Sequence, residues 1–381
     1  MRKGARKMAQ SSKTPLVRIS KRPDVPVQTK IIVYAAAILL ALVVCGIVTT
    51  FLTGLNPVAV YTTMIGGAFG STRRVWVMLQ DLAMLLCVSL ALAPAFRMKF
   101  WNLGGEGQVL MGCFACASCM LLIGDKLPSA ALILVSLVAS VAAGALWGLV
   151  PALFKARFNT NETLFTLMMN YVATQIVAYF VIVWENPKGS GKIGMINQST
   201  QAGWLPTIGG SKFLLNIIVV AVITVLMYIY MRYSKHGYEL AVVGESVDTA
   251  RYAGINTGRV IVRTMLLSGA VCGIAGFLLV AGTNHTLTTT VSGGLGFTGV
   301  MVAWLAKFNP FGMIASSFLI VFMECGAGEI STAFSLNQSF SDILTGIILF
   351  FIIGSEFFIT YQVHFRGHDK AAREATAKEE A

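Results

Sequence analysis

Few side chains in this sequence are of types that could carry out catalysis, and those few are scattered along the chain. The four histidines form no cluster, and the seven cysteines all fall within apolar runs. Cys113, Cys116 and Cys119 have a C-x2-C-x2-C spacing that could bind an iron–sulfur cluster. The same spacing places three small residues on one helix face, where a neighbouring helix can approach closely. We favour this packing explanation and predict no metal site.

One segment, Gly189-Ser190-Gly191-Lys192, looks like part of a phosphate-binding loop. The residue after the lysine is Ile193 rather than serine or threonine, and Asn186 occupies the position of the first motif glycine. We therefore expect a flexible loop here and no cofactor bound by this chain. If ATP powers the protein, another chain hydrolyses it.

Five acidic residues lie in or beside apolar runs: Asp81, Glu106, Glu324, Asp342 and Glu356. A charge at the centre of a bilayer costs at least ~2.5 kcal/mol, so such residues face a cavity or a partner. Asp81 and Glu324 are the most deeply placed along their runs. They could relay protons, anchor hydrogen bonds or line a pore, and the sequence alone leaves these roles open.

The amino-acid composition indicates whether these residues lie in water or in a lipid bilayer. Of the 381 residues, 56% are apolar and only 12% are charged, and the mean hydropathy is +0.73. Soluble domains carry about 25% charged residues, so most of this chain must lie in lipid. This excludes a soluble enzyme, a nucleic-acid-binding module and a disordered protein. The net charge of +12 is explained by retention of Lys and Arg on the cytoplasmic side.

About ten apolar runs are candidate membrane spans, each needing about 20 residues. They lie near 31–52, 75–96, 106–124, 130–152, 164–184, 213–231, 262–283, 297–306, 311–328 and 339–360. The eighth is short, which suggests half of a broken helix. We predict an all-α polytopic protein of the plasma membrane.

The distribution of basic residues predicts the orientation. With ten crossings and a cytoplasmic N-terminus, 23 of the 29 Lys and Arg residues fall on the cytoplasmic side. Both termini are then cytoplasmic. The expected organisation is a basic tail over 1–29, one transmembrane domain over 30–361 with a cytoplasmic loop at 232–261, and a C-terminal tail over 362–381. This last tail has the composition of a surface helix or a solvated segment.

Two glycine clusters interrupt the apolar pattern, one at 102–108 and the other at 292–299. Both contain G-G-x-G followed by an apolar run. Paired glycine-interrupted segments in two halves of a chain are typical of the substrate pathway in transporters. Close helix packing is the alternative explanation.

The predicted cytoplasmic loop contains a short candidate helix near 248–254. Asp248 could begin it and Gly254 could end it. Such a helix would lie on the cytoplasmic face and expose Arg251 and Tyr252. This arrangement favours docking to a partner over catalysis.

The loop also resembles the G-x-N-x-x-A-A-R-x-x-G-I motif of permease subunits in ABC importers, in the branch that handles sugars, branched-chain amino acids and nucleosides. The matching residues are Gly244, Ala250, Arg251, Gly254 and Ile255, while Ser246 replaces asparagine and Thr249 replaces the first alanine. In that family the loop forms a coupling helix that fits a groove on the ATPase subunit. The resemblance therefore implies that 244–255, including Glu245 and Tyr252, couples this chain to an ATPase.

Three further stretches support the resemblance, in the order expected. Residues 102–108 resemble N-I-G-A-E-G-Q, with Leu103 and Gly105 as departures. Residues 161–171 resemble N-E-x-x-x-T-L-M-x-N-Y, and residues 294–312 resemble a glycine-rich segment of the same family, with departures at Trp304 and Lys307. The first two look most like nucleoside-type permeases, whose partner is a basic-membrane-protein-type lipoprotein.

The resemblance implies a permease subunit that works with a cytoplasmic ATPase, a second permease subunit (identical or related) and an extracytoplasmic substrate-binding lipoprotein. Nucleosides are the expected cargo. The expected pathway residues, which could contact a base or a ribose, are Asn102, Glu106, Gln108, Asn170, Phe297 and Thr298.

Two alternatives remain open at this point. One keeps the family and changes the cargo to a simple sugar or a branched-chain amino acid. The other is an ion-coupled secondary transporter that uses Asp81, Glu324 and Asp342. A membrane-embedded enzyme is disfavoured, because no nucleophile and base lie at a suitable spacing.

Overall fold

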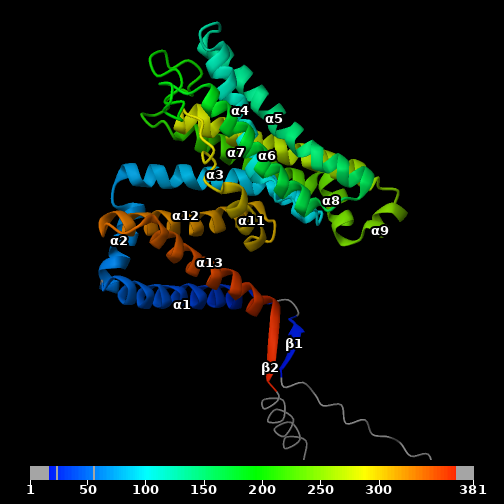
Figure 1. Ribbon diagram of the computed structural model, residues 1–381. Helices are drawn as coiled ribbons and strands as arrows, with labels where there is room; N and C mark the ends of the chain where they lie inside the picture. Colours follow the sequence, from blue (N-terminus) through cyan, green and yellow to red (C-terminus); the bar gives the residue numbers. More distant parts are fainter. Residues whose placement is uncertain (1–16, 23–24, 55, 366–381) are drawn as a thin grey trace, which may run out of the picture. The chain divides into compact units, whose positions relative to one another are not determined.

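The computed structural model describes residues 17–22, 25–54 and 56–365, and most of them are helical (Figure 1). This confirms the all-α, polytopic prediction. The chain divides into two compact units, one made of residues up to 61 together with residues from 337, and the other of residues 62–336. The tails at 1–16 and 366–381 lie outside the described residues.

The first unit pairs the first and last long helices, α1 (Val27–Thr53) and α13 (Gln338–Thr360). The hydroxyl of Tyr34 donates a 2.6 Å hydrogen bond to the Glu356 carboxylate, which explains one of the acids embedded in an apolar run. Asp342, another of these acids, is exposed near the start of α13.

A short antiparallel pair of strands completes this unit, β1 (Val17–Lys21) and β2 (Tyr361–Phe365). Tyr361 lies opposite Lys21, and Phe365 lies opposite Val17. The expectation of a helix or solvated segment from 362 onward is therefore wrong for residues 362–365. The alternation V-R-I-S-K can form a strand, and pairing with β2 satisfies its backbone groups.

The other helices are α2 (Pro57–Phe69), α3 (Thr72–Arg97), α4 (Gly105–Ile123), α5 (Ser129–Phe158), α6 (Glu162–Val183), α7 (Leu214–Tyr233), α8 (Lys235–Glu245), α9 (Val247–Tyr252), α10 (Thr257–Phe277), the π-helix η1 (Leu278–Asn284), α11 (Leu295–Leu305) and α12 (Pro310–Ala333). Within the described residues, nine helices are long and apolar enough to cross a membrane, counting α10 and η1 as one. They account for nine of the ten predicted runs. The short α2 was not among the predicted spans.

The eighth predicted run forms only the 11-residue helix α11, as expected for half of a broken helix. Before it, the chain is non-helical from His285 to Gly294. The carbonyl of His285 accepts a 2.8 Å hydrogen bond from Ile196, in the loop between α6 and α7, while Gly294 lies against Glu106 at the start of α4. This crossing therefore combines irregular backbone with a half-helix, which a membrane protein tolerates only where protein or water surrounds it.

The densest packing in the second unit joins α5 and α10. Each helix carries a G-x3-G pair: Gly144 and Gly148 in α5, and Gly269 and Gly273 in α10. A Cβ on Gly269 would overlap the carbonyl oxygen of Gly144, and a Cβ on Gly144 would overlap that of Gly269. The two backbones therefore touch directly, as small residues permit between membrane helices.

The cysteines on α4 belong to the same packed region. Cys113 and Cys116 are fully buried, and the Cys113 thiol lies 3.4 Å from the carbonyl oxygen of Gly276 on α10. No group of residues suited to holding a metal occurs in the described part of the chain. The burial of these thiols against α10 is what the packing explanation for the cysteine spacing predicts.

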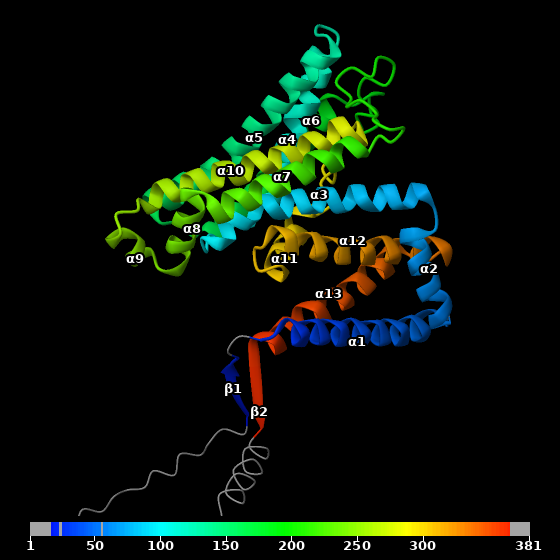
Figure 2. The same ribbon diagram turned by 180° about the vertical axis from the view of Figure 1, so that it is seen from behind.

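Figures 1 and 2 show α8 and α9 at one end of the long helices of this unit, and the loop between α6 and α7 at the other end. These two ends correspond to the basic and the weakly charged sides in the sequence. The predicted cytoplasmic loop and the predicted outer loop are thus on opposite faces of the unit.

Candidate functional site

The two glycine clusters meet, and Glu106 joins them. Its carboxylate accepts hydrogen bonds from the Ser292 hydroxyl (2.5 Å), the Gly294 N–H (3.0 Å) and the Gly296 N–H (2.8 Å). Glu106 also lies in the first turn of α4, where the helix dipole favours a negative charge. A carboxylate at the depth of the spans is thereby satisfied by three donors from the chain that leads into α11.

A second layer of buried amides supports the start of α4. Asn170 on α6 accepts a 2.8 Å hydrogen bond from the Gly107 N–H and donates one of 2.8 Å to the Leu103 carbonyl. Asn102 accepts from the Gly104 N–H at 3.0 Å and donates to the Ser268 hydroxyl on α10 at 3.2 Å. Asn170 of α6 and Asn102 thus satisfy backbone groups at the start of α4, and Ser268 of α10 holds the Asn102 side chain in place.

The six predicted pathway residues occupy two different environments. Asn102, Gln108 and Asn170 are buried, with at most 5% of their surface exposed. Phe297, in the first turn of α11, is 45% exposed, and its neighbour Thr298 is partly exposed. Glu106 lies between the two sets, because it bonds the chain that leads to Phe297.

The predicted coupling loop folds into two helices, α8 and α9, separated only by Ser246. The Ser246 hydroxyl accepts a 3.2 Å hydrogen bond from the Thr249 N–H and so caps α9. Serine therefore provides the N-terminal cap that asparagine provides in the family motif. The helix begins at Val247, with Asp248 in its first turn, and ends before Gly254, which has a φ of 77°.

The loop is anchored on one side and exposed on the other. Ala250 is fully buried in an apolar cluster with residues of α3, α5, α8 and α10, and its carbonyl accepts a 2.9 Å hydrogen bond from the Ile255 N–H. Gly244 packs against the carbonyl of Arg97, where a Cβ would overlap. By contrast, Tyr252 is 93% exposed and Arg251 is also exposed. This arrangement suits a rigid contact surface for another protein.

An ion pair ties α8 to α10. The Arg263 guanidinium donates a 2.6 Å hydrogen bond to the Glu239 carboxylate, and this bond lowers the pKa of Glu239. A force applied to α8 and α9 would therefore reach α10 through both the apolar cluster and this ion pair.

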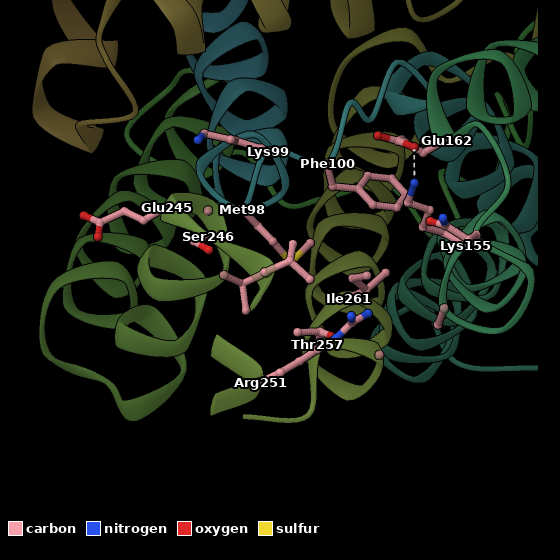
Figure 3. A pocket seen from close by; sticks show the side chains of 16 residues that line it. Met98, Lys99, Phe100, Lys155, Glu162, Glu245, Ser246, Arg251, Thr257 and Ile261 are labelled. Atoms are coloured by element: carbon pink, nitrogen blue, oxygen red, sulfur yellow. Dashed lines mark ion pairs between the residues drawn. The ribbon is translucent and has the colours of Figure 1, made fainter. Parts of the chain in front are cut away.

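Figure 3 shows a groove of about 480 Å³ beneath this loop. Glu245 and Ser246 lie on one side of it, Lys155 lies on the other, and Arg251 and Thr257 lie near each other between them. Lys155 at the end of α5 forms a 2.8 Å ion pair with Glu162 at the start of α6. The groove is thus lined both by the coupling loop and by the ends of α5, α6 and α10.

Asp81 on α3 and Glu324 on α12 present a different arrangement. Both residues are exposed in the single chain. Within the described residues, neither carboxylate has a hydrogen bond or a salt bridge. Because a carboxylate facing lipid is costly, this face of α3 and α12 must contact water or another subunit.

The segment that looked like a phosphate loop binds its own carboxylate. Glu185 accepts hydrogen bonds from the N–H groups of Gly189 (2.7 Å) and Gly191 (2.9 Å), the backbone donors that a phosphate would use. These two bonds lower the pKa of Glu185. A phosphate would have to displace this carboxylate to reach the two N–H groups.

The depressed pKa of Glu185 makes a prediction about the 186–194 segment. The ionised Glu185 carboxylate orders this segment through its two hydrogen bonds. This stabilisation should be complete above the ordinary carboxyl pKa of 4.5, and it should be lost as the pH falls through the lower pKa of Glu185 in the folded protein. At neutral pH, Glu185→Gln should have a similar effect, since it leaves one acceptor oxygen for two donors. Hydrogen exchange of 186–194, corrected for intrinsic rates, should be faster in this variant. Glu245→Gln, at the other end of the unit, should leave the segment unchanged, and equal exchange in both variants would contradict the prediction.

Several residues of the site were not found by the sequence analysis. Ser292, Ser268 and Thr166 complete the hydrogen bonds around the start of α4, and Thr166 accepts a 3.2 Å bond from the Leu103 N–H. Their one signal is a small hydroxyl within an apolar run, which is too common to single them out. Ser292 alone had a further indication, because it begins the second glycine cluster.

Residues 77–353 match the family described as branched-chain amino acid transport system, permease component. The chain is 30% identical to the guanosine ABC transporter permease protein NupP of Bacillus subtilis, over 84% of this chain and 92% of that protein. It is 26% identical to the nucleoside ABC transporter permease protein NupB of Lactococcus lactis, over 81% and 86% of the two chains. It is also 26% identical to the glucose ABC transporter permease protein TsgB13 of Haloferax volcanii, over 88% and 91%.

Proposed function

The chain belongs to the permease-component family of branched-chain amino acid transport systems, and from this membership we propose that it forms the pathway of an ATP-driven importer for nucleosides. It is a multi-pass protein of the plasma membrane and a transporter component rather than an enzyme. ATP is hydrolysed on a partner chain. The nucleoside cargo is supported by the names of two similar permeases, while the glucose permease among the relatives keeps a sugar as the alternative.

The observation that carries the proposal is the anchored and exposed coupling loop. Buried Ala250 fixes α9 to the ends of the spanning helices, while Arg251 and Tyr252 extend away from them. A cytoplasmic ATPase that grips these two side chains would move α8 and α9 as one body. The residues proposed to couple the chain to the ATPase are Gly244, Glu245, Ser246, Ala250, Arg251, Tyr252, Gly254 and Ile255. Gly244 and Ala250 are buried and anchor the loop, so direct contact falls to exposed members such as Arg251 and Tyr252.

The mechanism follows from what the coupling loop touches. ATP binding draws two ATPases together, and the loop passes this motion to α3, α5 and α10 through the apolar cluster that includes Ala95, Ala152 and Val260. ATP must stabilise one facing state of the permease over the other, because equal affinity for both states would shift nothing. A second permease subunit encloses the pathway, and a substrate-binding lipoprotein delivers cargo to the outer face.

We assign two roles to the six pathway residues. Phe297 is exposed and Thr298 is partly exposed at the start of α11, so both can contact cargo, and the Phe297 ring is available to stack on a base. Glu106 holds that helix start in place through its three hydrogen bonds, and the buried Asn102, Gln108 and Asn170 support the start of α4, which carries Glu106. The exposed carboxylates of Asp81 and Glu324 lie on the face that turns toward the pathway or the second subunit.

Reversing the charge of Arg251 should uncouple transport. In Arg251→Glu we expect ATP-driven uptake to fall at least tenfold, because the new carboxylate meets the ATPase surface that received a cation. Since the Arg251 side chain is 66% exposed, stability should change by only about 0.5 kcal/mol. Arg157→Glu, an exposed cation at the end of α5 outside the loop, is the matched control. Full uptake by a correctly inserted Arg251→Glu protein would refute the coupling role.

The cargo is tested by uptake of labelled guanosine in cells with and without this chain. Uptake that needs the chain, resists an uncoupler and is unaffected by ribose or leucine is the expected result. Competition by ribose or leucine would point to the sugar or amino-acid alternatives. Uptake that collapses with the uncoupler at preserved ATP would favour a secondary transporter.

A further inference from the structure

The helix α10 and the π-helix η1 form one span that runs from the coupling loop to the predicted outer loop (Figure 2). At the cytoplasmic end, Val260 lies in the apolar cluster with Ala250, and Arg263 pairs with Glu239 of α8. At the other end, His285 follows η1 and contacts the loop between α6 and α7. This single element therefore contacts structures on both predicted faces of the membrane.

Two backbone hydrogen bonds join η1 to residues 196–205 of the outer loop, which we call the outer cap. The Leu205 N–H donates a 2.9 Å hydrogen bond to the Ala281 carbonyl. The Ile196 N–H donates one of 2.8 Å to the His285 carbonyl. Both ends of the outer cap are therefore bonded to the last turn of the span.

The Trp204 side chain adds a ring contact between the outer cap and η1. Its ring is stacked on that of His285, with 3.8 Å between centroids and 7° between planes. The indole N–H donates a 2.9 Å hydrogen bond to the Ile196 carbonyl, which fixes the orientation of the ring. The outer cap is itself anchored to α4, because the Asn197 amide donates a 3.0 Å hydrogen bond to the Met120 carbonyl. It therefore acts as a fixed clamp on the end of η1.

The clamped turn has a backbone register that differs from an α-helix by one residue. The His285 N–H donates a 3.0 Å hydrogen bond to the Val280 carbonyl, an i→i+5 bond. An α-helix closes each turn at i→i+4 and so needs one residue fewer. His285 also has a φ of 50°, a left-handed conformation that is costly for a residue with a side chain. Conversion of η1 to an α-helix would release one residue into the chain that follows.

Two amides beside η1 are only half satisfied in the π register. The Thr283 hydroxyl accepts hydrogen bonds from Gln80 on α3 (2.7 Å) and from Asn216 on α7 (3.1 Å). The carbonyl oxygens of both amides are buried, and neither has a hydrogen-bond partner within the described residues. Buried polar atoms are normally paired, so these two oxygens disfavour the π register. Other contacts must maintain it, and those of the outer cap are in place to do so.

The chain that follows η1 leads to the cargo-contacting end of α11. Residues 286–291 connect His285, which the outer cap holds, to Ser292, which is bonded to the start of α4. Leu287 within this connection is fully buried. One additional residue in so short a connection would displace Leu287 and the first turn of α11, where Phe297 is exposed.

From these observations we propose that η1 is a register switch and that Trp204 and His285 are its positioning residues. While the stacked rings clamp η1, it remains a π-helix. Release of the clamp converts it to an α-helix and feeds one residue into 286–291. The switch thereby sets the position of Phe297 from the outer face, where the lipoprotein delivers cargo. This use of the switch rests on the proposed function, whereas its existence is tested without transport.

The test measures hydrogen exchange of residues 286–291 in the full-length chain in lipid nanodiscs. Trp204→Ala should speed this exchange about fivefold, the equivalent of the ~1 kcal/mol of a stacked aromatic pair. Trp204→Phe keeps a ring over His285 and should exchange like wild type. Trp184→Ala is the matched control, because Trp184 follows α6 and stacks on Phe114 of α4.

Deletion of one residue from η1 distinguishes a switch from a merely structural contact. Removal of Leu279 leaves enough residues for an α-helix and no residue to release. Exchange of 286–291 should then become insensitive to Trp204→Ala, whereas a merely structural Trp204 would have the same effect in both backgrounds. Deletion of Val280 is a second variant with the same expectation.

The proposal is supported by faster exchange in Trp204→Ala that is absent in Trp184→Ala and in the deletion background. Unchanged exchange in Trp204→Ala, equal acceleration in Trp184→Ala, or the same acceleration in the deletion background would overturn it. Failure of both deletion variants to accumulate as folded protein would show that η1 cannot adopt the α form, and would also overturn it. Exchange is measured without cargo, so the result is independent of whether guanosine is transported.

Discussion

Substitution of Gly269 by alanine is expected to destabilise the protein by about 3 kcal/mol, and substitution by leucine should prevent accumulation of folded protein. The added Cβ would overlap the carbonyl oxygen of Gly144, which is backbone and cannot turn away. Separating α5 from α10 would disrupt the most extensive helix contact of the unit. Thermal unfolding of the detergent-solubilised protein, followed by size-exclusion chromatography, measures the effect.

Gly328→Ala is the matched control for this prediction. Gly328 lies within α12, and a Cβ there would meet nothing within 4 Å. Since alanine is the better helix former by about 1 kcal/mol, this variant should be at least as stable as wild type. If Gly269→Ala unfolded at the same temperature as Gly328→Ala, the direct backbone contact between α5 and α10 would be refuted.

Replacing Glu106 by glutamine should destabilise the protein nearly as much as Gly269→Ala does. The carboxylate receives three donors, whereas a glutamine side chain has one acceptor oxygen and turns its amide hydrogens toward a donor. We expect a loss of about 2 to 4 kcal/mol and little or no transport, because the start of α11 is no longer held. The unfolding temperature and the rate of guanosine uptake should both decrease in this variant.

Two variants test whether the loss of stability comes from the hydrogen bonds of Glu106 or from any removal of a charge within a spanning helix. Ser292→Ala removes a single donor, leaves Glu106 with two, and should cost about 1 kcal/mol. Glu324→Gln makes the same change of charge in a spanning helix at a carboxylate without hydrogen bonds in the described part of the chain, and its thermal stability should be preserved. A Glu106→Gln protein as stable as Glu324→Gln would show that the three bonds do not hold the two segments together.

The spans and the polar coupling loop could be predicted from the sequence because their signals are local. An apolar run of 20 residues is visible without the fold, and so is a short helix near 248–254. The sequence placed Asp248 at the start of that helix, whereas the structure places the N-cap at Ser246. The end of the unit that carries most Lys and Arg residues could also be predicted, by counting these residues in each loop between the apolar runs. Even the shortness of α11 could be predicted from the length of its run.

Features that depend on distant partners could not be predicted. The meeting of the glycine clusters was suggested only by their similarity, and nothing in the sequence paired Glu106 with Ser292. The amides Asn102 and Asn170 could be identified as unusual in an apolar run, but not as ligands of backbone groups on α4. The strand at Val17–Lys21 was missed because the basic character of the tail dominated the interpretation, although its alternation was present.

The three hydrogen bonds of Glu106 also bear on how the protein is made. Their donors lie 186 to 190 residues later in the chain. At 5–20 residues per second, the ribosome needs roughly 10 to 40 s to reach them after Glu106 has been synthesised. During that interval the Glu106 carboxylate on α4 lacks these donors. Placing an unpaired charge in hydrocarbon is costly, so the first turn of α4 does not enter the hydrocarbon core at this stage. The start of α4 must wait in a hydrated setting until α11 arrives, which makes the order of membrane insertion a property encoded by one glutamate.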